Sequence, residues 1–118
     1  MALTIDVVKG DVHVTLVLSG DVDTKTAPDL LGHLTSLELH GLEQLRLDLI
    51  KVDFVSSAGL RAIVFAKQKM PHSSRLYLVG PSVEIVETIT KTGLSQAVVI
   101  VDSEADIKRC DEKLQDRA

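Results

Sequence analysis

Short strand-like segments and amphipathic helix-like segments alternate along most of this 118-residue chain, which limits the folds available to it. Strands are predicted at residues 44–50, 75–79 and 97–101, where apolar residues alternate or form short runs. Helical spacing of apolar residues follows the first two of them, at 57–70 and from Ser82 onward. Strands joined through helices lie parallel in one sheet and are connected by right-handed crossovers.

The first forty residues add an antiparallel edge and one more helix. Residues 3–8 and 12–18 alternate between apolar and polar side chains and are separated by a short turn, which predicts a β-hairpin. The helix that follows is predicted to begin at Thr24 or Thr26, because threonine can cap a helix. It is predicted to close at residues 40–41, where a glycine follows a histidine.

The C-terminal part predicts a last helix that begins after residues 102–103. Three of its apolar residues are expected to face inward: Ala105, Ile107 and Leu114. The complete order is then ββαβαβαβα, a single α/β domain with a mixed, mostly parallel β-sheet packed with α-helices. We predict that this domain occupies residues 1–110, and that the charged tail at 111–118 frays.

Composition excludes several classes of function. Only 3% of the residues are aromatic, and the formal net charge is −4 with no basic stripe, so we expect no binding to nucleic acid. A lone cysteine, Cys110, excludes an internal disulfide and a cysteine-based zinc site, and the histidines lack metal-ligand spacing. We expect no metal and no cofactor. The chain has neither a signal peptide nor the ~18 apolar residues that a membrane span needs, which favours a cytoplasmic protein without membrane association.

Catalysis is not expected either. The carboxylates are scattered along the chain, and the motifs GxGxxG, Walker A and GxSxG are absent. The most informative stretch is DFVSSAGLRAIVFAK, residues 53–67, where a strand gives way to a helix. Either Ser56 or Ser57 caps that helix. An exposed hydroxyl at the positive end of a helix is also a place where a phosphate can be received, so a serine here is a plausible switch as well as a cap.

Three stretches of this sequence resemble the STAS domain family, and within it the bacterial anti-sigma factor antagonists. They are Gly20-Asp21-Val22-Asp23, LRLDLIKVDFVSSAGLRAIV and the late TKTGL, so that the resemblance covers nearly the whole chain. The central stretch is the most specific of the three: an apolar strand ending in a Leu-Asp pair, a short link, and then S-S-A-G-L-R.

The resemblance implies a protein that switches partners when it is phosphorylated. In that family a serine kinase, which is also the anti-sigma factor, phosphorylates the serine just before the helix, and a PP2C-type phosphatase reverses the reaction. The unphosphorylated antagonist binds the kinase, and phosphorylation abolishes binding. Matched onto this sequence, the acceptor is Ser57, with Ser56 as second choice. The usual family pattern is D-S-[SA]-G-L, and Ser56 stands here in the position of its aspartate.

The same resemblance, with helical spacing, gives a predicted partner-binding surface. It comprises Asp21, Asp23, Ser56, Ser57, Ala58, Gly59, Arg61 and Phe65. Arg61 and Phe65 follow Ser57 at intervals of four along one helix face, and such residues are common interface anchors. Alternatively, Phe65 closes the rim of the core while Arg61 is solvated, Asp21 and Asp23 are polar residues of a turn, and Gly59 serves close backbone packing.

Two rival functions remain open from the sequence. A STAS module can regulate an output other than a sigma factor, as a secretion or transporter accessory or as a ligand sensor. A small enzyme of flavodoxin-like appearance would need a phosphate-binding glycine loop after the first parallel strand. The sequence there, GDVDTKT, lacks one.

Overall fold

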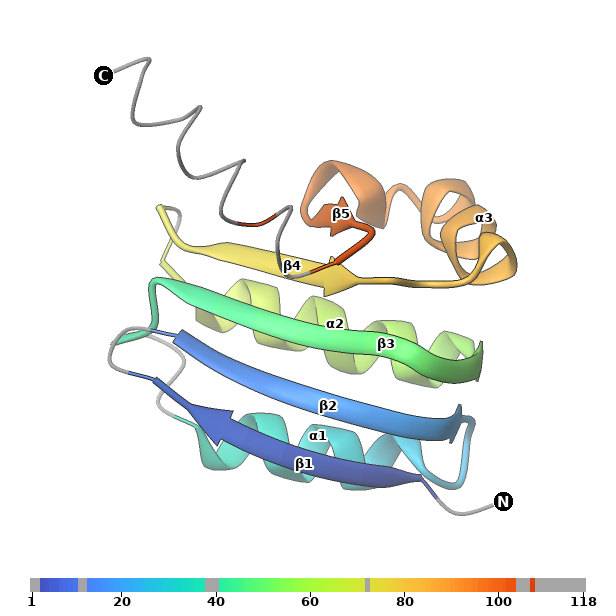
Figure 1. Cartoon of the computed structure of the whole chain (residues 1–118), viewed down its shortest axis with the longest axis horizontal. Helices are drawn as coiled ribbons and strands as arrows, with labels where there is room; N and C mark the ends of the chain where they lie inside the picture. The colour runs from blue at the N-terminus through green and yellow to red at the C-terminus, as the bar shows by residue number, and fades with distance from the viewer. Residues whose placement is uncertain (1–2, 11–12, 38–40, 72, 104–106, 108–118) are drawn as a thin grey trace.

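A mixed five-stranded sheet forms the centre of the computed structural model, which describes residues 3–10, 13–37, 41–71, 73–103 and 107 (Figure 1). Its strands lie side by side in sequence order: β1 (Thr4–Lys9), β2 (His13–Val22), β3 (Gln44–Val55), β4 (Arg75–Val79) and β5 (Val99–Val101). β1 pairs with β2 antiparallel, and every other pair is parallel. The predicted α/β class, the hairpin and the mostly parallel sheet are confirmed.

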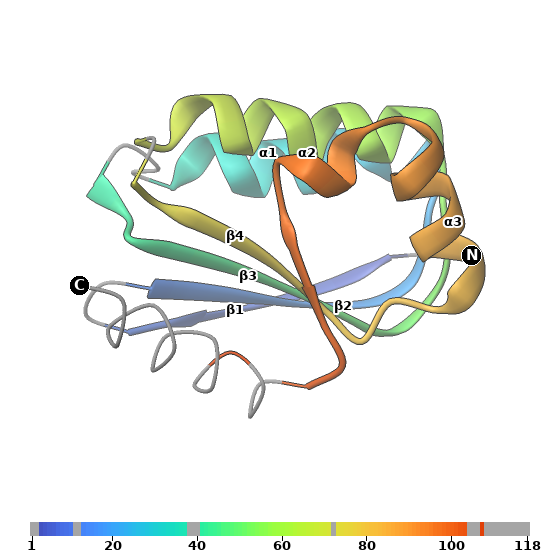
Figure 2. The same ribbon diagram turned by 90° about the horizontal axis from the view of Figure 1, so that it is seen from above.

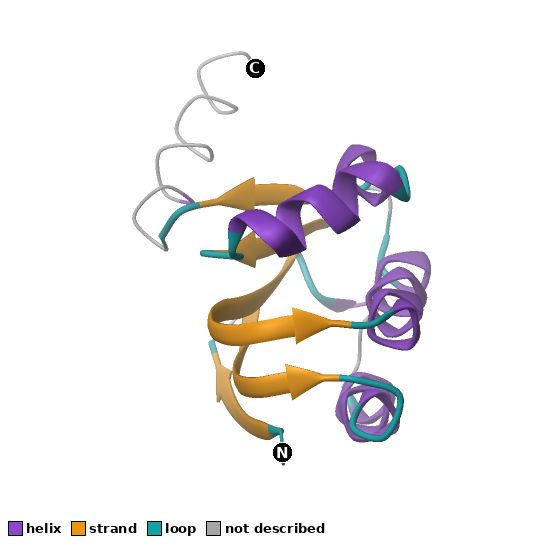
Figure 3. Cartoon of the chain, turned by 90° about the vertical axis from the view of Figure 1, so that its right-hand side faces the viewer, coloured by secondary structure: helices purple, strands orange, loops and turns teal. Residues whose placement is uncertain are grey.

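The helices follow the parallel strands. They are α1 (Ala27–Ser36), α2 (Ser57–Lys69) and α3 (Val83–Lys91), with a short 3₁₀ helix, η2 (Leu94–Gln96), before β5. Strands that advance in one direction through right-handed crossovers receive their helices on one face. α1 and α2 accordingly lie side by side on the same face of the sheet and pack against each other (Figures 2 and 3).

The main core fills the space between that face and the two helices. Leu16, Leu47 and Leu78 are directly paired across β2, β3 and β4 and have no exposed surface. Leu30 and Leu34 of α1 belong to the same buried cluster. The main core is therefore aliphatic.

A smaller cluster covers part of the opposite face, at β4 and β5. Tyr77 and Val79 alternate with the core leucines of β4 and so point to this side. They pack with Val101 and with Ile107, which is fully buried. The prediction that Ile107 faces inward is confirmed. Ala105, Leu114 and the 111–118 tail lie outside the described residues.

β3 is longer than the sequence analysis predicted, ending at Val55 rather than at residue 50. Val52 and Val55 are buried against the end of β2. Ile50, which precedes them in the strand, is exposed. Register shifts against β2 break the alternation there, and Asp48 Oδ1 accepts a hydrogen bond from Ile50 N at 3.1 Å. The extension carries the strand directly into α2, so the predicted short link is absent.

Three other boundaries differ from the prediction. β2 continues to Val22, because it pairs with the extended part of β3. α1 ends at Ser36, since Leu37 is already extended, and not at residues 40–41. The last strand begins at Val99 rather than at residue 97, because η2 and the turn after it take up the preceding residues. None of the described helices is long and apolar enough to cross a membrane.

Candidate functional site

The start of α2 is held to the end of β2 through Ser56. Its backbone is extended, and its hydroxyl accepts a hydrogen bond from Gly59 N at 3.2 Å, which makes it the N-cap of α2. Its amide donates to Val22 O at 2.7 Å. The amide and the hydroxyl of Ser56 are therefore both hydrogen-bonded within the fold. The sequence allowed either serine as the cap, and the structure shows that it is Ser56.

Gly59 sets how closely α2 approaches the sheet. A Cβ at this position would lie 2.6 Å from Val22 Cγ1 and 2.9 Å from Val55 Cγ1, closer than real side chains come. The alternative that Gly59 serves close packing is confirmed. Because it is buried, Gly59 acts on the site by placing α2 rather than by offering a surface.

Ser57 differs from its neighbour in being exposed. It is the first residue of α2, one position beyond the cap, and its side chain makes no hydrogen bond with any described residue. The two serines therefore have separate environments: the hydroxyl of Ser56 accepts a bond from the helix, and that of Ser57 has no partner among the described residues.

The loop between β2 and α1 is organised by Asp23 and Thr26. Asp23 Oδ1 accepts from Lys25 N and Thr26 N, each at 2.9 Å. Thr26 Oγ1 donates to Asp21 O at 2.8 Å and accepts from Asp23 N at 2.9 Å. The hydrogen bond from Thr26 N, with that from Lys25 N, lowers the pKa of Asp23 because both stabilise the carboxylate form. Asp23 therefore has the turn role that the sequence left as an alternative. Thr26 occupies the N-cap position of α1 as predicted, but its hydroxyl bonds back to this loop instead of capping the helix.

Two grooves flank the exposed face of α2. The first, of about 450 Å³, lies between α2 and the turn after α3; we call it the α2–α3 groove, and its lining includes Ser57, Arg61, Phe65, Thr92, Gly93 and Leu94. The second, of about 280 Å³, lies between α1 and α2; we call it the α1–α2 groove, and its lining includes Thr24, Pro28, Leu31, Ala58, Arg61 and Phe65. Arg61 and Phe65 line both grooves and form the ridge between them.

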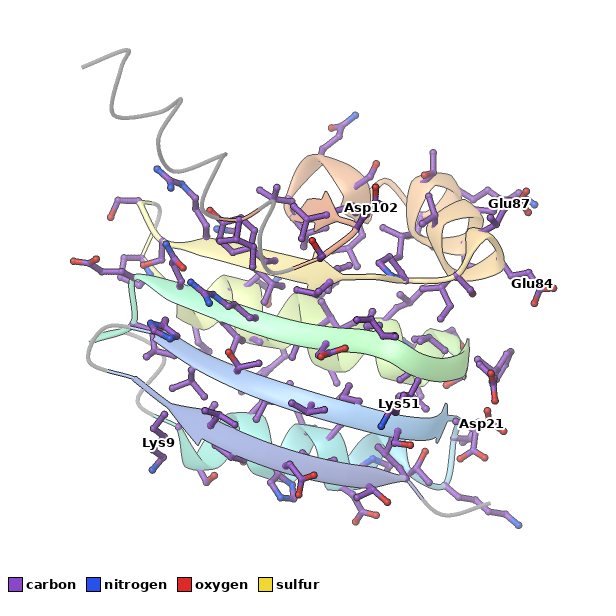
Figure 4. The ribbon with its side chains drawn as sticks, viewed as in Figure 1. Lys9, Asp21, Lys51, Glu84, Glu87 and Asp102 are labelled. Carbon is purple, nitrogen blue, oxygen red and sulfur yellow. The ribbon has the colours of Figure 1, made fainter. Side chains whose placement is uncertain are left out.

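Acidic side chains occupy the end of the molecule at which α2 begins. Asp21, Glu84 and Glu87 lie at this end, where β2 and β3 finish, and exposed Lys51 lies close to it (Figure 4). Ser57 therefore lies at an end that carries several carboxylates beside fewer basic side chains, in a chain with net charge −4. Within the described part of the chain, no three His, Cys, Asp or Glu side chains are grouped to hold a metal ion.

The structure brings most of the predicted surface residues together. Ser57, Ala58, Arg61 and Phe65 lie along one exposed side of α2, and Thr24 of the β2–α1 loop joins them in the α1–α2 groove. Phe65 is half-buried and Arg61 exposed. The sequence analysis missed the opposite walls of the grooves, Leu31 and Thr92–Leu94. The stretch TKTGL resembles the family, but nothing in its sequence indicates that it lies beside α2.

A family model decides what kind of domain this is. The STAS domain model matches residues 4–107. The chain belongs to the STAS domain family. Residues 4–107 contain every described helix and strand, so the family match covers the sheet, both grooves and the Ser56–Ser57 stretch.

Among curated proteins, this STAS chain is similar to the anti-sigma-B factor antagonist of Listeria monocytogenes. The two are 29% identical over 109 residues, which cover 91% of this chain and 96% of the Listeria protein. The anti-sigma-B factor antagonist of Listeria innocua matches to the same extent.

Solved structures of anti-sigma factor antagonists share the fold. The antagonist from Mycobacterium paratuberculosis superposes with a TM-score of 0.81 at 23% identity, covering 92% of each chain. The Bacillus cell fate determinant SpoIIAA in its phosphorylated form gives a TM-score of 0.69 at 14% identity, covering 91% of this chain and 99% of SpoIIAA. At these identities the likeness shows the fold alone.

Proposed function

We propose that this chain is an anti-sigma factor antagonist that switches partners through phosphorylation of Ser57. In the unphosphorylated form it binds a serine kinase that is also the anti-sigma factor. The kinase transfers the γ-phosphoryl group of ATP to Ser57 Oγ, ADP leaves, and the modified antagonist is released. A PP2C-type phosphatase hydrolyses the phosphoserine and restores binding. The antagonist itself catalyses nothing in this cycle.

The observation that carries the proposal is the different use of two adjacent hydroxyls. Ser56 Oγ accepts the capping bond from Gly59 N, whereas Ser57 is an exposed residue whose Oγ makes no bond with a described residue. A kinase must reach the hydroxyl that it modifies, so Ser57 is favoured over Ser56. The family aspartate that Ser56 replaces would also be a good N-cap, which explains how a serine is accommodated there.

The environment of Ser57 supports a phosphate that disrupts binding. A phosphoserine adds about −1.5 to −2 charges at neutral pH. Asp21 and Glu84 lie at the same end of the molecule (Figure 4), so a phosphate on Ser57 adds negative charge where carboxylates are already present. Phosphorylation then places a bulky, hydrated group at a packed contact, where an unpaired charge costs several kcal/mol.

The relatives support the same function. Proteins named anti-sigma-B factor antagonists are similar over nearly the whole of this chain. SpoIIAA, which shares the fold, has been solved both in an unphosphorylated form, with a TM-score of 0.72, and in a phosphorylated form. A protein that exists in these two forms is what a phosphorylation switch requires.

Intact-mass spectrometry after incubation with the candidate kinase and ATP tests the proposal. The wild type should gain one phosphate, and Ser57→Ala should gain none. Ser56→Asp is the matched control, because it removes the neighbouring hydroxyl, keeps a capping side chain and restores the family pattern. It should still gain one phosphate. A phosphate that persists in Ser57→Ala and disappears in Ser56→Asp would move the acceptor to Ser56. No phosphate on the wild type with any active candidate kinase would refute the switch.

A further inference from the structure

The proposed switch gives Arg61 no role in the phosphorylated form, although this residue lies close to Ser57 on the surface. It is exposed, lies one turn after Ser57, and lines both grooves together with Phe65. Among the described residues it has no hydrogen-bond or ion-pair partner. A guanidinium held between two grooves is available both to a binding partner and to a charge that appears nearby.

The spacing of Ser57 and Arg61 brings a phosphate within reach of that guanidinium. Residues four apart share a helix face, and the rise between them is about 6 Å. Long helical side chains point back toward the N-terminus, so the Arg61 side chain covers the turn that contains Ser57. Arginine presents a planar fork of donors that binds phosphate in a bidentate manner.

The other charges around the grooves are less well placed for this pairing. Lys25 lies in the β2–α1 loop and Lys91 ends α3; both are exposed, but neither lines the groove that contains Ser57. Lys69 stands over the Phe65 ring, 5.5 Å from its centre, and is about 18 Å from Ser57 along α2. Asp23 holds its carboxylate against the amides of its own loop.

We propose that Arg61 is the internal counter-ion of the phosphate on Ser57, and that this pairing withdraws the guanidinium from the partner-binding ridge. The inference rests on the proposed function. Phosphorylation then has two effects. It introduces negative charge, and its phosphate pairs with Arg61, which among the described residues is the one cation that lines both grooves. The ridge between the grooves then presents Phe65 without the charge of Arg61, although Lys69 still stands over its ring.

The test needs no kinase. Phosphoserine is installed at position 57 during translation, and the second ionisation of the phosphate is followed by ³¹P NMR at low salt. A surface ion pair lowers the phosphate pKa by roughly 0.2 to 0.7 unit, so Arg61→Gln should raise it by that amount. Arg61→Lys should keep part of the lowering, because it keeps the charge. Lys69→Gln, which removes a charge from the far end of the same helix, should leave the phosphate pKa unchanged. Salt should reduce the difference between wild type and Arg61→Gln.

Equal titration of the phosphate in Arg61→Gln and in the wild type would overturn the inference, and would leave the first amides of α2 as the phosphate's contacts. Equal shifts in Arg61→Gln and Lys69→Gln would also overturn it, because they would show a general field rather than a pair. Circular dichroism establishes that each variant is folded, which is expected because both side chains are exposed. Since the phosphate is installed directly, a failed kinase assay refutes the proposed function without touching this result, and the reverse also holds.

Discussion

Replacing Gly59 by alanine should destabilise the domain, although alanine is the better helix former. The new Cβ would lie 2.6 Å from Val22 Cγ1 and 2.9 Å from Val55 Cγ1, both closer than the 3.0 Å that real contacts respect. Val22 and Val55 are 1% and 6% exposed, so neither side chain has free space to move into. Both are β-branched and therefore stiff at χ1. The start of α2 would therefore have to move away from the end of β2 to make room for the new Cβ.

The magnitude follows from two opposing contributions. Overpacking a well-filled core costs about 1–3 kcal/mol. The higher helix propensity of alanine returns at most about 1 kcal/mol. With the full propensity gain subtracted, we expect a net loss of up to about 2 kcal/mol in the free energy of unfolding, measured by urea denaturation with the slope unchanged. In a domain of this size, about 1 kcal/mol corresponds to roughly 4 °C in Tm.

Gly32→Ala is the matched control. Gly32 also lies within a helix, α1, but a Cβ there would meet nothing within 4 Å. The same substitution should therefore stabilise the domain by up to about 1 kcal/mol. If Gly59→Ala proved as stable as Gly32→Ala, this would show that the close approach of α2 to Val22 and Val55 does not constrain the fold.

Three further predictions concern the cap, the ridge and the loop. Ser56→Ala should lower the free energy of unfolding by about 1 kcal/mol, whereas Ser56→Asp should retain it; equal thermal midpoints for the two would contradict the cap. Phe65→Ala should weaken binding to the cognate kinase by about 2 kcal/mol, roughly 30-fold in the Kd measured by calorimetry. Phe54 is 52% exposed but lies outside both grooves, so Phe54→Ala should have little effect. Unchanged affinity in Phe65→Ala would show that the ridge does not anchor the kinase. The pKa of Asp23 is lower in the folded state, so its stabilisation is present above pH ~4 and disappears as the pH falls through the folded-state pKa. Asp23→Asn should flatten that acid limb in urea titrations between pH 2 and 6, and an identical limb would contradict the role of the carboxylate.

The order of strands and helices could be predicted because local patterns and the fold agree over most of the chain. β3 beyond residue 50 is the clearest failure. Ile50 and Lys51 are both exposed, as are Asp53 and Phe54, so the two-residue period is lost where the register shifts. A strand whose alternation is broken by bulges looks from the sequence like a strand that has ended. Only pairing with β2 shows that the backbone continues.

The candidate site also has a part that the sequence predicts and a part that it does not. Ser56 and Ser57 could be singled out because capping is a local property of a few residues. The grooves could not, because their walls come from elements that are distant in sequence. Thr92 and Leu94 meet α2 only after β4 and α3 have been placed. The helical spacing of Arg61 and Phe65 predicted one face, whereas the structure shows that this face is a ridge with a groove on each side.

The cap at Ser56 has a consequence for how quickly a switch at the next residue can operate. Its amide is bound to Val22 O and its hydroxyl to Gly59 N, and neither bond involves the side chain of Ser57. A modification of Ser57 would therefore leave α2 in register and would require no segment to refold. Partner exchange would then keep pace with the enzymes that add and remove the phosphate, with no slow relaxation of the antagonist between the two states.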